Sequence, residues 1–455
     1  MKYTKVGAVS LGCSKNTVDT EIMLGELASL GFELVPDPGQ AEIIIVNTCG
    51  FITSAKQDSL DTIIEMAEYK KTGPAKLLCV TGCLSQRYPR ELSEELPEVD
   101  LFWGVRDYPA FAQKLFSLVS EGDVPSAKRL PTVPCCGAKR LISTPPYRAY
   151  LRIADGCDNR CTYCAIPLIR GGRVSVPMEK LVAEAAALAE SGVTELTVIA
   201  QDTSAYGIDL YGKPMLAELL KKLSAIEKLR WIRVLYAYPN TVTEELVDTM
   251  RDDPKLCNYI DIPIQHITPR MLTRMNRHGS AEHIREIVDY IRRNAPDFIL
   301  RTTVMTGFPG ETEEDHQELM KFLRLHPFDR VGAFTYSAED GTPAAEMPEQ
   351  VDPEVAERRL DELMRLQQSV SLRLNRARVG REYTVLTESV GSDGRGEYLI
   401  ARSYAEAPDV DGVIRVRPGE GRRFNKLILP GDYVKVRITS AQLYDLTAQI
   451  IKEEN

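Results

Sequence analysis

The stretch Asp155-Gly-Cys-Asp-Asn-Arg-Cys-Thr-Tyr-Cys164 carries three cysteines spaced C-x3-C-x2-C, namely Cys157, Cys161 and Cys164. Three thiolates this close in sequence can surround one small cluster, and cysteine thiolates are the ligands of iron–sulfur clusters, usually four to a cubane. The nearest other cysteines are Cys136 and Cys257, so we expect the fourth iron to be open to a chelating small molecule. The alternatives are a zinc site and buried structural cysteines. A closed zinc site needs a second Cys or His pair, and none follows this stretch.

The composition favours a globular protein of the cytoplasm. The 455 residues are enough for roughly three domains. The formal net charge of -9 argues against a general electrostatic attraction to nucleic acid, although local basic patches remain compatible with it. The sequence contains no apolar run long enough for a membrane span, and its first residues lack the apolar region of a secretory signal. Ten cysteines in such a chain indicate metal or redox chemistry rather than disulfides.

Three further cysteines follow predicted strands within residues 1–125. Apolar runs at 6–11, 41–46 and 76–81 alternate with helical patterns, which predicts a parallel α/β sheet. Each run is followed by a cysteine: Cys13, Cys49 and Cys83. Because ligand sites in open α/β sheets form outside the carboxyl ends of the strands, we predict that these thiolates share one crevice and hold a second cluster. The alternative is that they are small buried apolar residues, as free cysteines often are.

After a Pro-rich linker at 126–145, residues 146–378 alternate between strand and helix patterns. Six strands with five intervening helices predict a partial, six-stranded (β/α)6 relative of the TIM barrel. The cysteine loop follows the first strand, at the barrel end where active residues are expected. Polar residues follow later strands, where they either face a cofactor or substrate or close turns: Gln201, Asp202, Gln265 and His266.

The C-terminal domain is expected at 379–455, after a long helix at 355–378. Five short strands there predict a small closed β-barrel of the OB type, a class that binds nucleic acids or basic tails. Residues 376–455 carry 13 basic and 12 acidic side chains, which is not the basic excess of a phosphate-binding module. A local basic group keeps RNA contact possible: Arg415, Arg417, Arg422, Arg423 and Lys426.

Together these motifs resemble the radical S-adenosylmethionine (radical-SAM) methylthiotransferases along the whole chain. The N-terminal domain of that family is similar in three stretches: Leu11-Gly-Cys13, Asn47-Thr-Cys49-Gly-Phe and Thr81-Gly-Cys83. Its radical-SAM core is similar in Gly156 to Cys164, Ile166-Pro and Arg170-Gly-Gly-Arg173, and its TRAM domain is similar to the C-terminal tail. Further stretches resemble the branch that methylthiolates the β-carbon of an aspartate in ribosomal protein S-twelve: 10–19, 49–56, Tyr236-Ala-Tyr-Pro239 and Asp261-Ile-Pro-Ile-Gln-His266. Ser14 departs from that branch, which often carries Pro there.

The resemblance implies two [4Fe–4S] clusters and S-adenosyl-L-methionine as cofactors. Cys157, Cys161 and Cys164 would hold the radical-SAM cluster, and Cys13, Cys49 and Cys83 an auxiliary cluster where sulfur and methyl are assembled. Tyr163 is expected beside the adenine, with Glu195 and Gln201 as further SAM-pocket candidates. The implied partners are ribosomal protein S-twelve, an electron donor such as flavodoxin or ferredoxin, and a sulfur source.

Two alternative functions remain open at this point. One is a transfer RNA adenosine methylthiotransferase, and the other is an RNA-binding iron–sulfur protein that does not cleave SAM. The acidic chain and the near-neutral TRAM domain favour a basic protein substrate over RNA. On this interpretation the TRAM domain grips a basic loop through some of its carboxylates, with these candidates: Glu388, Asp393, Glu397, Asp409 and Asp411.

Overall fold

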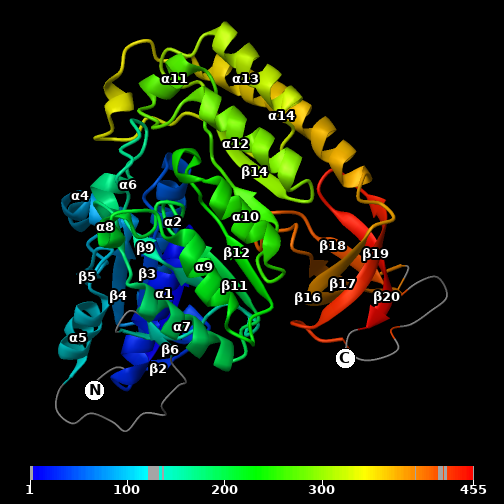
Figure 1. Ribbon diagram of the computed structural model, residues 1–455. Coiled ribbons are helices and arrows are strands. Elements are labelled where there is room, and N and C mark those ends of the chain that lie inside the picture. The colour runs from blue at the N-terminus through cyan, green and yellow to red at the C-terminus, as the bar shows by residue number, and fades with distance from the viewer. Residues whose placement is uncertain are drawn as a thin grey trace.

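Figure 1 shows the computed structural model, which describes residues 4–120, 133–135, 138–394, 396–418, 424 and 428–453. An N-terminal sheet domain in blue and a C-terminal barrel in red lie on opposite sides of a green central barrel. The predicted fold class is therefore confirmed: α/β, with a closed C-terminal β-barrel. None of the described helices has the combination of length and apolar character that crossing a membrane requires.

The N-terminal domain is a five-stranded parallel sheet in the order β2-β1-β3-β4-β5. Its strands are β1 (Lys5–Ser10), β2 (Glu33–Leu34), β3 (Ile43–Thr48), β4 (Leu77–Gly82) and β5 (Leu101–Phe102). All six residues of the central strand β3 are buried, which explains its uninterrupted apolar run. The helices are α1 (Ser14–Ser29), α2 (Thr53–Thr72), α3 (Cys83–Arg87), α4 (Pro89–Glu95) and α5 (Tyr108–Val119).

The predicted linker at 126–145 is described only in part, because 126–132 and 136–137 lie outside the described residues. Its described part includes the hairpin of β6 (Val133–Cys135) and β7 (Ala138–Arg140). The buried Arg140 side chain pairs with Glu21 of α1 at 2.6 Å and with Glu184 of the barrel helix α7 (Met178–Glu190) at 2.9 Å. This segment therefore fastens the N-terminal domain to the barrel as well as connecting the two.

The central barrel has the six parallel strands that the sequence predicts, arranged as two three-stranded sheets, β12-β11-β8 and β13-β14-β15. Ile232 bridges Leu256 where the sheets meet. The strands are β8 (Arg148–Arg152), β11 (Glu195–Ile199), β12 (Trp231–Val234), β13 (Tyr259–Asp261), β14 (Ile299–Thr306) and β15 (Arg330–Thr335). The long covering helices are α7, α9 (Leu216–Ser224), α10 (Glu244–Asp252), α12 (Ala281–Asn294) and α13 (Glu313–Leu325).

Several short elements were not predicted, because two to six residues are too few to show a periodic pattern. They are β9 (Ala154–Asp155), α6 (Ile166–Arg170), β10 (Val174–Ser175), α8 (Ile208–Tyr211) and α11 (Pro269–Arg274). Two of them, β9 and α6, border the cysteine loop at 157–164 and shape its entry and exit.

The long helix α14 (Pro353–Arg376) leads into the closed C-terminal barrel, whose strand order is β16-β17-β18-β20-β19. Its strands are β16 (Glu382–Asp393), β17 (Gly396–Arg402), β18 (Ile414–Arg417), β19 (Tyr433–Ala441) and β20 (Leu446–Glu453). Within the basic group noted in the sequence, Arg415 and Arg417 lie on β18 beside the Tyr398 ring. The other members of that group, Arg422, Arg423 and Lys426, lie outside the described residues.

Buried ion pairs join the C-terminal barrel to the amino ends of the central barrel strands. Glu195, the first residue of β11, accepts from Arg402 at 2.7 Å and from Arg233 at 3.3 Å. Glu406 pairs in the same way with Arg378 at 2.6 Å and Arg330 at 3.5 Å. Burial raises the pKa of both glutamates, but the flanking arginines outweigh it and lower each pKa to about 2. Both carboxylates therefore stay charged at neutral pH.

Two of the carboxylates expected to grip a substrate are instead part of this junction. Asp409 accepts two hydrogen bonds from Arg148, at 2.8 and 3.0 Å. Asp411 is buried at its side chain and accepts from the Tyr259 hydroxyl at 2.7 Å. The expectation that Asp411 is free to bind a basic loop is therefore wrong, because its side chain is buried. Asp409 is held by Arg148, but its side chain remains 61% exposed.

The remaining three candidates are on the C-terminal barrel itself. Glu388 pairs with Arg402, and Asp393 pairs with Arg417. Glu397 is exposed, and among the residues that the structure describes it makes no ion pair. Of the five carboxylates, Glu397 alone keeps the free, exposed character that the docking hypothesis requires.

The junction predicts a large stability difference between two arginine substitutions. Arg402→Met leaves Glu195 and Glu388 with less compensation in a buried setting, which should lower the free energy of unfolding by about 3–5 kcal/mol. The control is Arg437→Met, because Arg437 pairs with Glu382 where both side chains are 54% exposed, and such pairs contribute about 0–1 kcal/mol. Urea denaturation of both variants measures the difference. Equal losses would show that the buried junction carries no special share of the stability.

Candidate functional site

Cys13, Cys49 and Cys83 converge at the carboxyl edge of the N-terminal sheet, as predicted. Cys49 directly follows β3, Cys83 directly follows β4, and Cys13 comes three residues after β1; these three strands are neighbours in the sheet. The approach is close: a Cβ placed on Gly12, whose φ is +88°, would lie 2.9 Å from the Cβ of Cys49. Glycine is required there, since both its backbone conformation and the contact exclude a larger residue.

One amide side chain links all three cysteine loops. The Nδ2 of Asn16 donates to the carbonyl of Leu11 at 3.0 Å and to the carbonyl of Thr48, the residue before Cys49, at 2.9 Å. Its Oδ1 lies 3.7 Å from the Sγ of Cys83. The sequence analysis missed Asn16, although its place in Cys13-Ser-Lys-Asn16 was a usable signal. A fully bonded amide at this position fixes the spacing of the three loops.

The thiols of this site differ in how their surroundings affect ionisation. Burial raises the pKa of Cys83 to about 12 and also raises the pKa of Cys49. For Cys13, burial acts in the same direction, but Lys15, the backbone N–H groups and Arg170 outweigh it and lower the pKa. Cys13 therefore supplies a thiolate most readily, and a bound metal would have to displace the protons of the other two.

The second cysteine loop starts at the carboxyl end of the first barrel strand. The backbone N–H of Cys157 donates to the carbonyl of Gly171 at 3.1 Å. Gly156 has φ +74°, and a Cβ there would lie 2.1 Å from the oxygen of Gly172, so only glycine fits. Burial raises the pKa of Cys157 to about 11 and that of Cys164 to about 12. The loop is thus a tight, partly buried turn with its three sulfur atoms on one short segment.

A buried arginine lies next to this loop. Arg277 places Nη1 3.8 Å from the Sγ of Cys161 and donates to the hydroxyl of Tyr163 at 3.0 Å. Its guanidinium also lies over the Tyr238 ring, 4.4 Å from the centroid. The Tyr163 ring packs edge-on against Phe308, with 6.4 Å between centroids. Tyr163 is therefore held at the cysteine loop by Arg277 and Phe308, and its place beside the adenine stays a prediction.

Neither cysteine set is preformed as a site for a single metal ion: among the described residues, no three His, Cys, Asp or Glu side chains meet that geometry. An iron–sulfur cubane needs a different arrangement of ligands. Each cysteine thiolate bonds its own iron, so the cysteine sulfur atoms lie farther apart than around a single ion. Each set offers three cysteine thiols on a rigid backbone and thus has the ligand chemistry that a cubane requires.

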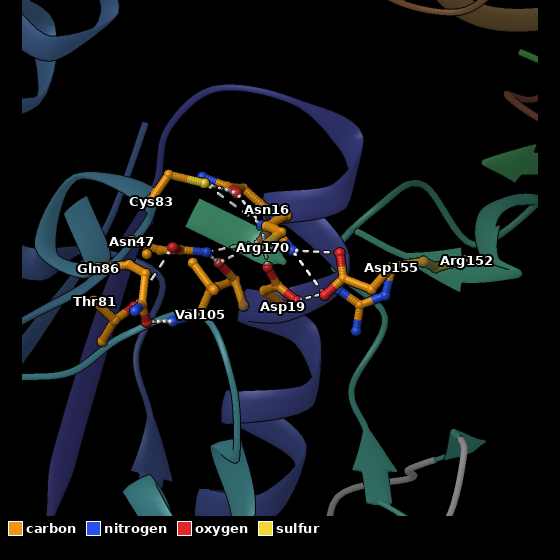
Figure 2. A network of polar contacts seen from close by, with 12 residues as sticks. Asn16, Asp19, Asn47, Thr81, Cys83, Gln86, Val105, Arg152, Asp155 and Arg170 are labelled. Atoms are coloured by element: carbon orange, nitrogen blue, oxygen red, sulfur yellow. Dashed lines mark hydrogen bonds and ion pairs between the residues drawn. The ribbon is translucent and has the colours of Figure 1, made fainter. Parts of the chain in front are cut away.

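Arg170, the last residue of α6, joins the two cysteine sites (Figure 2). Its Nη2 donates to Asp19 at 2.7 Å and to Asn16 at 2.9 Å, and lies 3.7 Å from the Sγ of Cys83. Its Nη1 donates to Asp155, which begins the second cysteine loop, at 3.1 Å. The side chain is 2% exposed. A single buried guanidinium group thus contacts a cysteine of one site and the loop of the other.

Arg152 and Arg170 share the two carboxylates of this network, Asp19 and Asp155. Asp19 also accepts from Arg152, the last residue of β8. Burial raises the pKa of Asp155, but Arg152 and Arg170 outweigh it and lower that pKa. Two positive and two negative side chains therefore balance one another where the N-terminal domain meets the barrel (Figure 2).

A second polar contact joins the domains beyond the last barrel strand. Glu339 is buried and accepts from Lys56 of α2 at 2.9 Å and from Arg87 of α3 at 2.8 Å. Arg87 also donates to the carbonyl of Gly50, next to Cys49, at 2.9 Å. The helices that follow Cys49 and Cys83 are thereby tied to the sixth strand, while Arg170 ties the site to the first.

Gln201 and Glu195 have different surroundings, although both belong to the β11 region. Gln201 follows the carboxyl end of β11 and donates to Asp155 at 3.0 Å, while its Oε1 is buried without a hydrogen-bond partner among the described residues. An unpaired acceptor beside the cysteine loop suits a donor group on a cofactor. Glu195 lies at the other end of the strand and is saturated by arginines. The expectation that Glu195 contributes to the SAM pocket is therefore wrong.

The remaining strand-end residues also make defined contacts. Asp202 accepts from Asn159 in the cysteine loop at 2.9 Å and from Ser204 at 2.9 Å, so it both closes a turn and steadies the loop. The Nδ1 of His266 accepts from the N–H of Ile267 at 2.9 Å. Gln265 has φ +67° and a buried Oε1 without a partner in the described part of the chain.

Comparison with known proteins agrees with this geometry. Three family models match successive parts of the chain: the uncharacterized protein family UPF0004 at 5–104, the radical SAM superfamily at 151–323 and the TRAM domain at 379–451. A ribosomal protein uS12 methylthiotransferase RimO from Citrifermentans bemidjiense is 48% identical, with 98% of each chain covered. The RimO of Caldicellulosiruptor saccharolyticus is also 48% identical, covering 98% of this chain and all of its own length. The chain belongs to the RimO family.

Solved structures support the fold of this RimO family member but not its finer chemistry. A radical S-adenosylmethionine methyltransferase, TsrM from Kitasatospora setae, matches with a TM-score of 0.55 over 87% of this chain and 79% of its own, at 13% identity. At that identity the likeness establishes the fold alone. The predicted radical-SAM methylthiotransferase family is confirmed by the RimO relatives and the three domain matches.

The Arg170 bridge predicts that the two cysteine loops loosen together. Arg170→Gln removes the shared cation, so backbone amides at 11–20 and at 155–164 should both exchange faster with deuterated solvent. Arg170→Lys should lie between wild type and Arg170→Gln, because it keeps the charge but not the forked geometry. Arg365→Gln is the control, since Arg365 is 75% exposed in its ion pair with Asp361. Faster exchange in only one of the two loops would argue against a bridge.

Proposed function

We propose that this chain methylthiolates the β-carbon of an aspartate in ribosomal protein uS12. The observation that carries the proposal is the identity of 48% over 98% of the chain to relatives named as uS12 methylthiotransferases. Both cysteine triads lie at the strand ends that such chemistry would use. The acidic net charge of -9 also suits a basic ribosomal protein better than an RNA.

In this proposal Cys157, Cys161 and Cys164 bind a [4Fe–4S] cluster whose fourth iron takes S-adenosyl-L-methionine. When bound, that pair supplies a 5′-deoxyadenosyl radical, which removes hydrogen from an unactivated carbon, a step outside the reach of acid–base chemistry near neutral pH. The chain's own part is to bind and to shield. Tyr163 presents its ring at the cysteine loop, and the unpaired Oε1 of Gln201 accepts a hydrogen bond from the cofactor.

Cys13, Cys49 and Cys83 bind an auxiliary cluster in the same proposal. Asn16 holds the three loops at a fixed separation, and Arg170 and Glu339 keep this crevice against the barrel. Such bracing on both sides would keep the two cofactor sites at a constant distance, as transfer of a small group between them requires.

The proposed chemistry also implies partners and a cellular location. We propose an electron donor such as flavodoxin or ferredoxin, an external sulfur source, and a place of action in the cytoplasm, where ribosomal proteins are made. We also propose the domain division 1–125, 126–145, 146–378 and 379–455. Nucleic acid is a secondary partner at most in this proposal.

Two clusters per chain predict a defined iron content. Anaerobic reconstitution should give about eight irons per monomer, from two four-iron clusters. A triple Cys157/Cys161/Cys164→Ala variant should keep about half of that iron and lose reductive SAM cleavage. The matched Cys13/Cys49/Cys83→Ala variant should also keep about half, but should still cleave SAM while failing to methylthiolate. Complete loss of iron from either folded variant would refute the two-site arrangement.

The substrate assignment predicts the outcome of deleting the gene for this chain. Mass analysis of ribosomal proteins from the deletion strain should show uS12 lighter by one methylthio group, with the transfer RNA unchanged. Restoring the wild-type chain should restore the mass, whereas restoring the Cys13/Cys49/Cys83→Ala variant should not. Loss of a transfer RNA modification with uS12 unaffected would move the assignment to the transfer RNA alternative.

A further inference from the structure

The Lys15 side chain is largely buried, and its ammonium group has no carboxylate partner among the described residues. Lys15 is the second residue of α1, two residues after Cys13, and is 8% exposed. Among the residues that the structure describes, its ammonium makes no hydrogen bond or ion pair. It lies over the ring of Tyr236, with Nζ 3.3 Å from the ring centroid. The other buried cations at this interface, Arg152 and Arg170, both pair with Asp19.

Lys15 extends from the auxiliary cysteine site into the mouth of the barrel. Tyr236 follows β12 and has φ +64°, and its carbonyl accepts from the N–H of Thr203 at 3.0 Å. Thr203 comes two residues after Gln201, which donates to Asp155 at the start of the other cysteine loop. The ammonium therefore lies on the barrel side of the Cys13 site, over a residue that follows a barrel strand.

The neighbouring charges satisfy this ammonium only in part: the Lys15 ammonium lowers the pKa of Cys13 electrostatically, but it makes no hydrogen bond to that thiol. The Asp261 carboxylate interacts with it electrostatically, but beyond ion-pair distance, and Asp261 already pairs with Arg301 at 3.3 Å. Burying an unpaired charge is costly, and a cation over an aromatic ring offsets only part of that cost. An ammonium group in this position at the mouth of the barrel favours binding of an anion from outside the chain.

We propose that Lys15 binds the side-chain carboxylate of the substrate aspartate. This inference rests on the proposed function and names the residue that selects its substrate. In an aspartate the β-carbon is bonded directly to the carboxylate carbon. An ion pair between Lys15 and that carboxylate would therefore also fix the position of the reacting β-carbon. The ammonium belongs to the loop of Cys13, which places the β-carbon next to the auxiliary site. An adenosine base carries no carboxylate, so the base itself would offer this ammonium no anionic partner.

A double-mutant cycle tests this contact with reconstituted full-length enzyme. One partner is Lys15→Met, which keeps an unbranched side chain of similar length without the charge. The other is uS12 with its modified aspartate, identified beforehand by mass analysis, changed to asparagine. Each single change should weaken binding of uS12 by about thirtyfold or more, and the double change should add little, since both remove one ion pair. Lys114→Met, at an exposed lysine of α5, is the matched control and should bind as wild type does.

Three further measurements separate binding of the substrate from a structural or cofactor role. Reductive SAM cleavage without uS12 should stay at the wild-type level in Lys15→Met, while methylthiolation falls. The two enzymes are compared at equal iron content, because Lys15 also lowers the pKa of Cys13. Losses that simply add in the cycle, or unchanged affinity of Lys15→Met for uS12, would overturn the inference and leave the proposed function standing. Loss of SAM cleavage would instead assign Lys15 to the carboxylate of SAM. If the wild-type enzyme neither binds nor modifies uS12, the proposed function fails first and the inference with it.

Discussion

The Arg170 guanidinium group donates simultaneously to Asp19 and Asn16 of the N-terminal domain and to Asp155 of the barrel. A charged group buried to this extent is tolerated only where fixed partners replace the water it has lost. Its position therefore determines how the N-terminal sheet meets the barrel, and with it how the two cysteine sites face each other. Glu339 makes a second buried contact at the far edge of the barrel. With both contacts present, the auxiliary crevice is braced against the first and the sixth strand.

The two ends of the central barrel have separate tasks, and β11 shows the division within one strand. At its amino end Glu195 is saturated by Arg402 and Arg233, and this junction holds the C-terminal barrel in place. Beyond its carboxyl end Gln201 contacts Asp155 and keeps an unpaired acceptor beside the cysteine loop. The C-terminal barrel is thus fastened at the amino ends of the central strands, whereas the cysteine loop follows the carboxyl end of β8. Stability and chemistry are accordingly placed at opposite strand ends.

Much of the fold was predictable, because the strands and long helices carry strong periodic signals. The buried run of β3, the six barrel strands and the five strands of the C-terminal barrel were all expected, whereas the helix α5 and short elements such as β9 and α6 were missed. The convergence of Cys13, Cys49 and Cys83 was also predictable, because parallel strands deliver the residues that follow them to one edge. Asn16 and Arg170 were not recognised as site residues, since nothing in a linear pattern tells which polar groups meet after folding.

The sequence by itself determined which atoms are available for chemistry. Two sets of three cysteines, their spacing and their places after strands are properties of the chain order, and no folding detail alters them. Only the tertiary structure decided how buried charges are matched, because an ion pair joins residues far apart in sequence and its strength depends on the water that folding removes. That is why Asp411, plausible as a substrate contact in the sequence, is buried at the junction, and why Asp409 is held there by Arg148. It is also why Lys15 makes no ion pair among the described residues, although it lies over the Tyr236 ring.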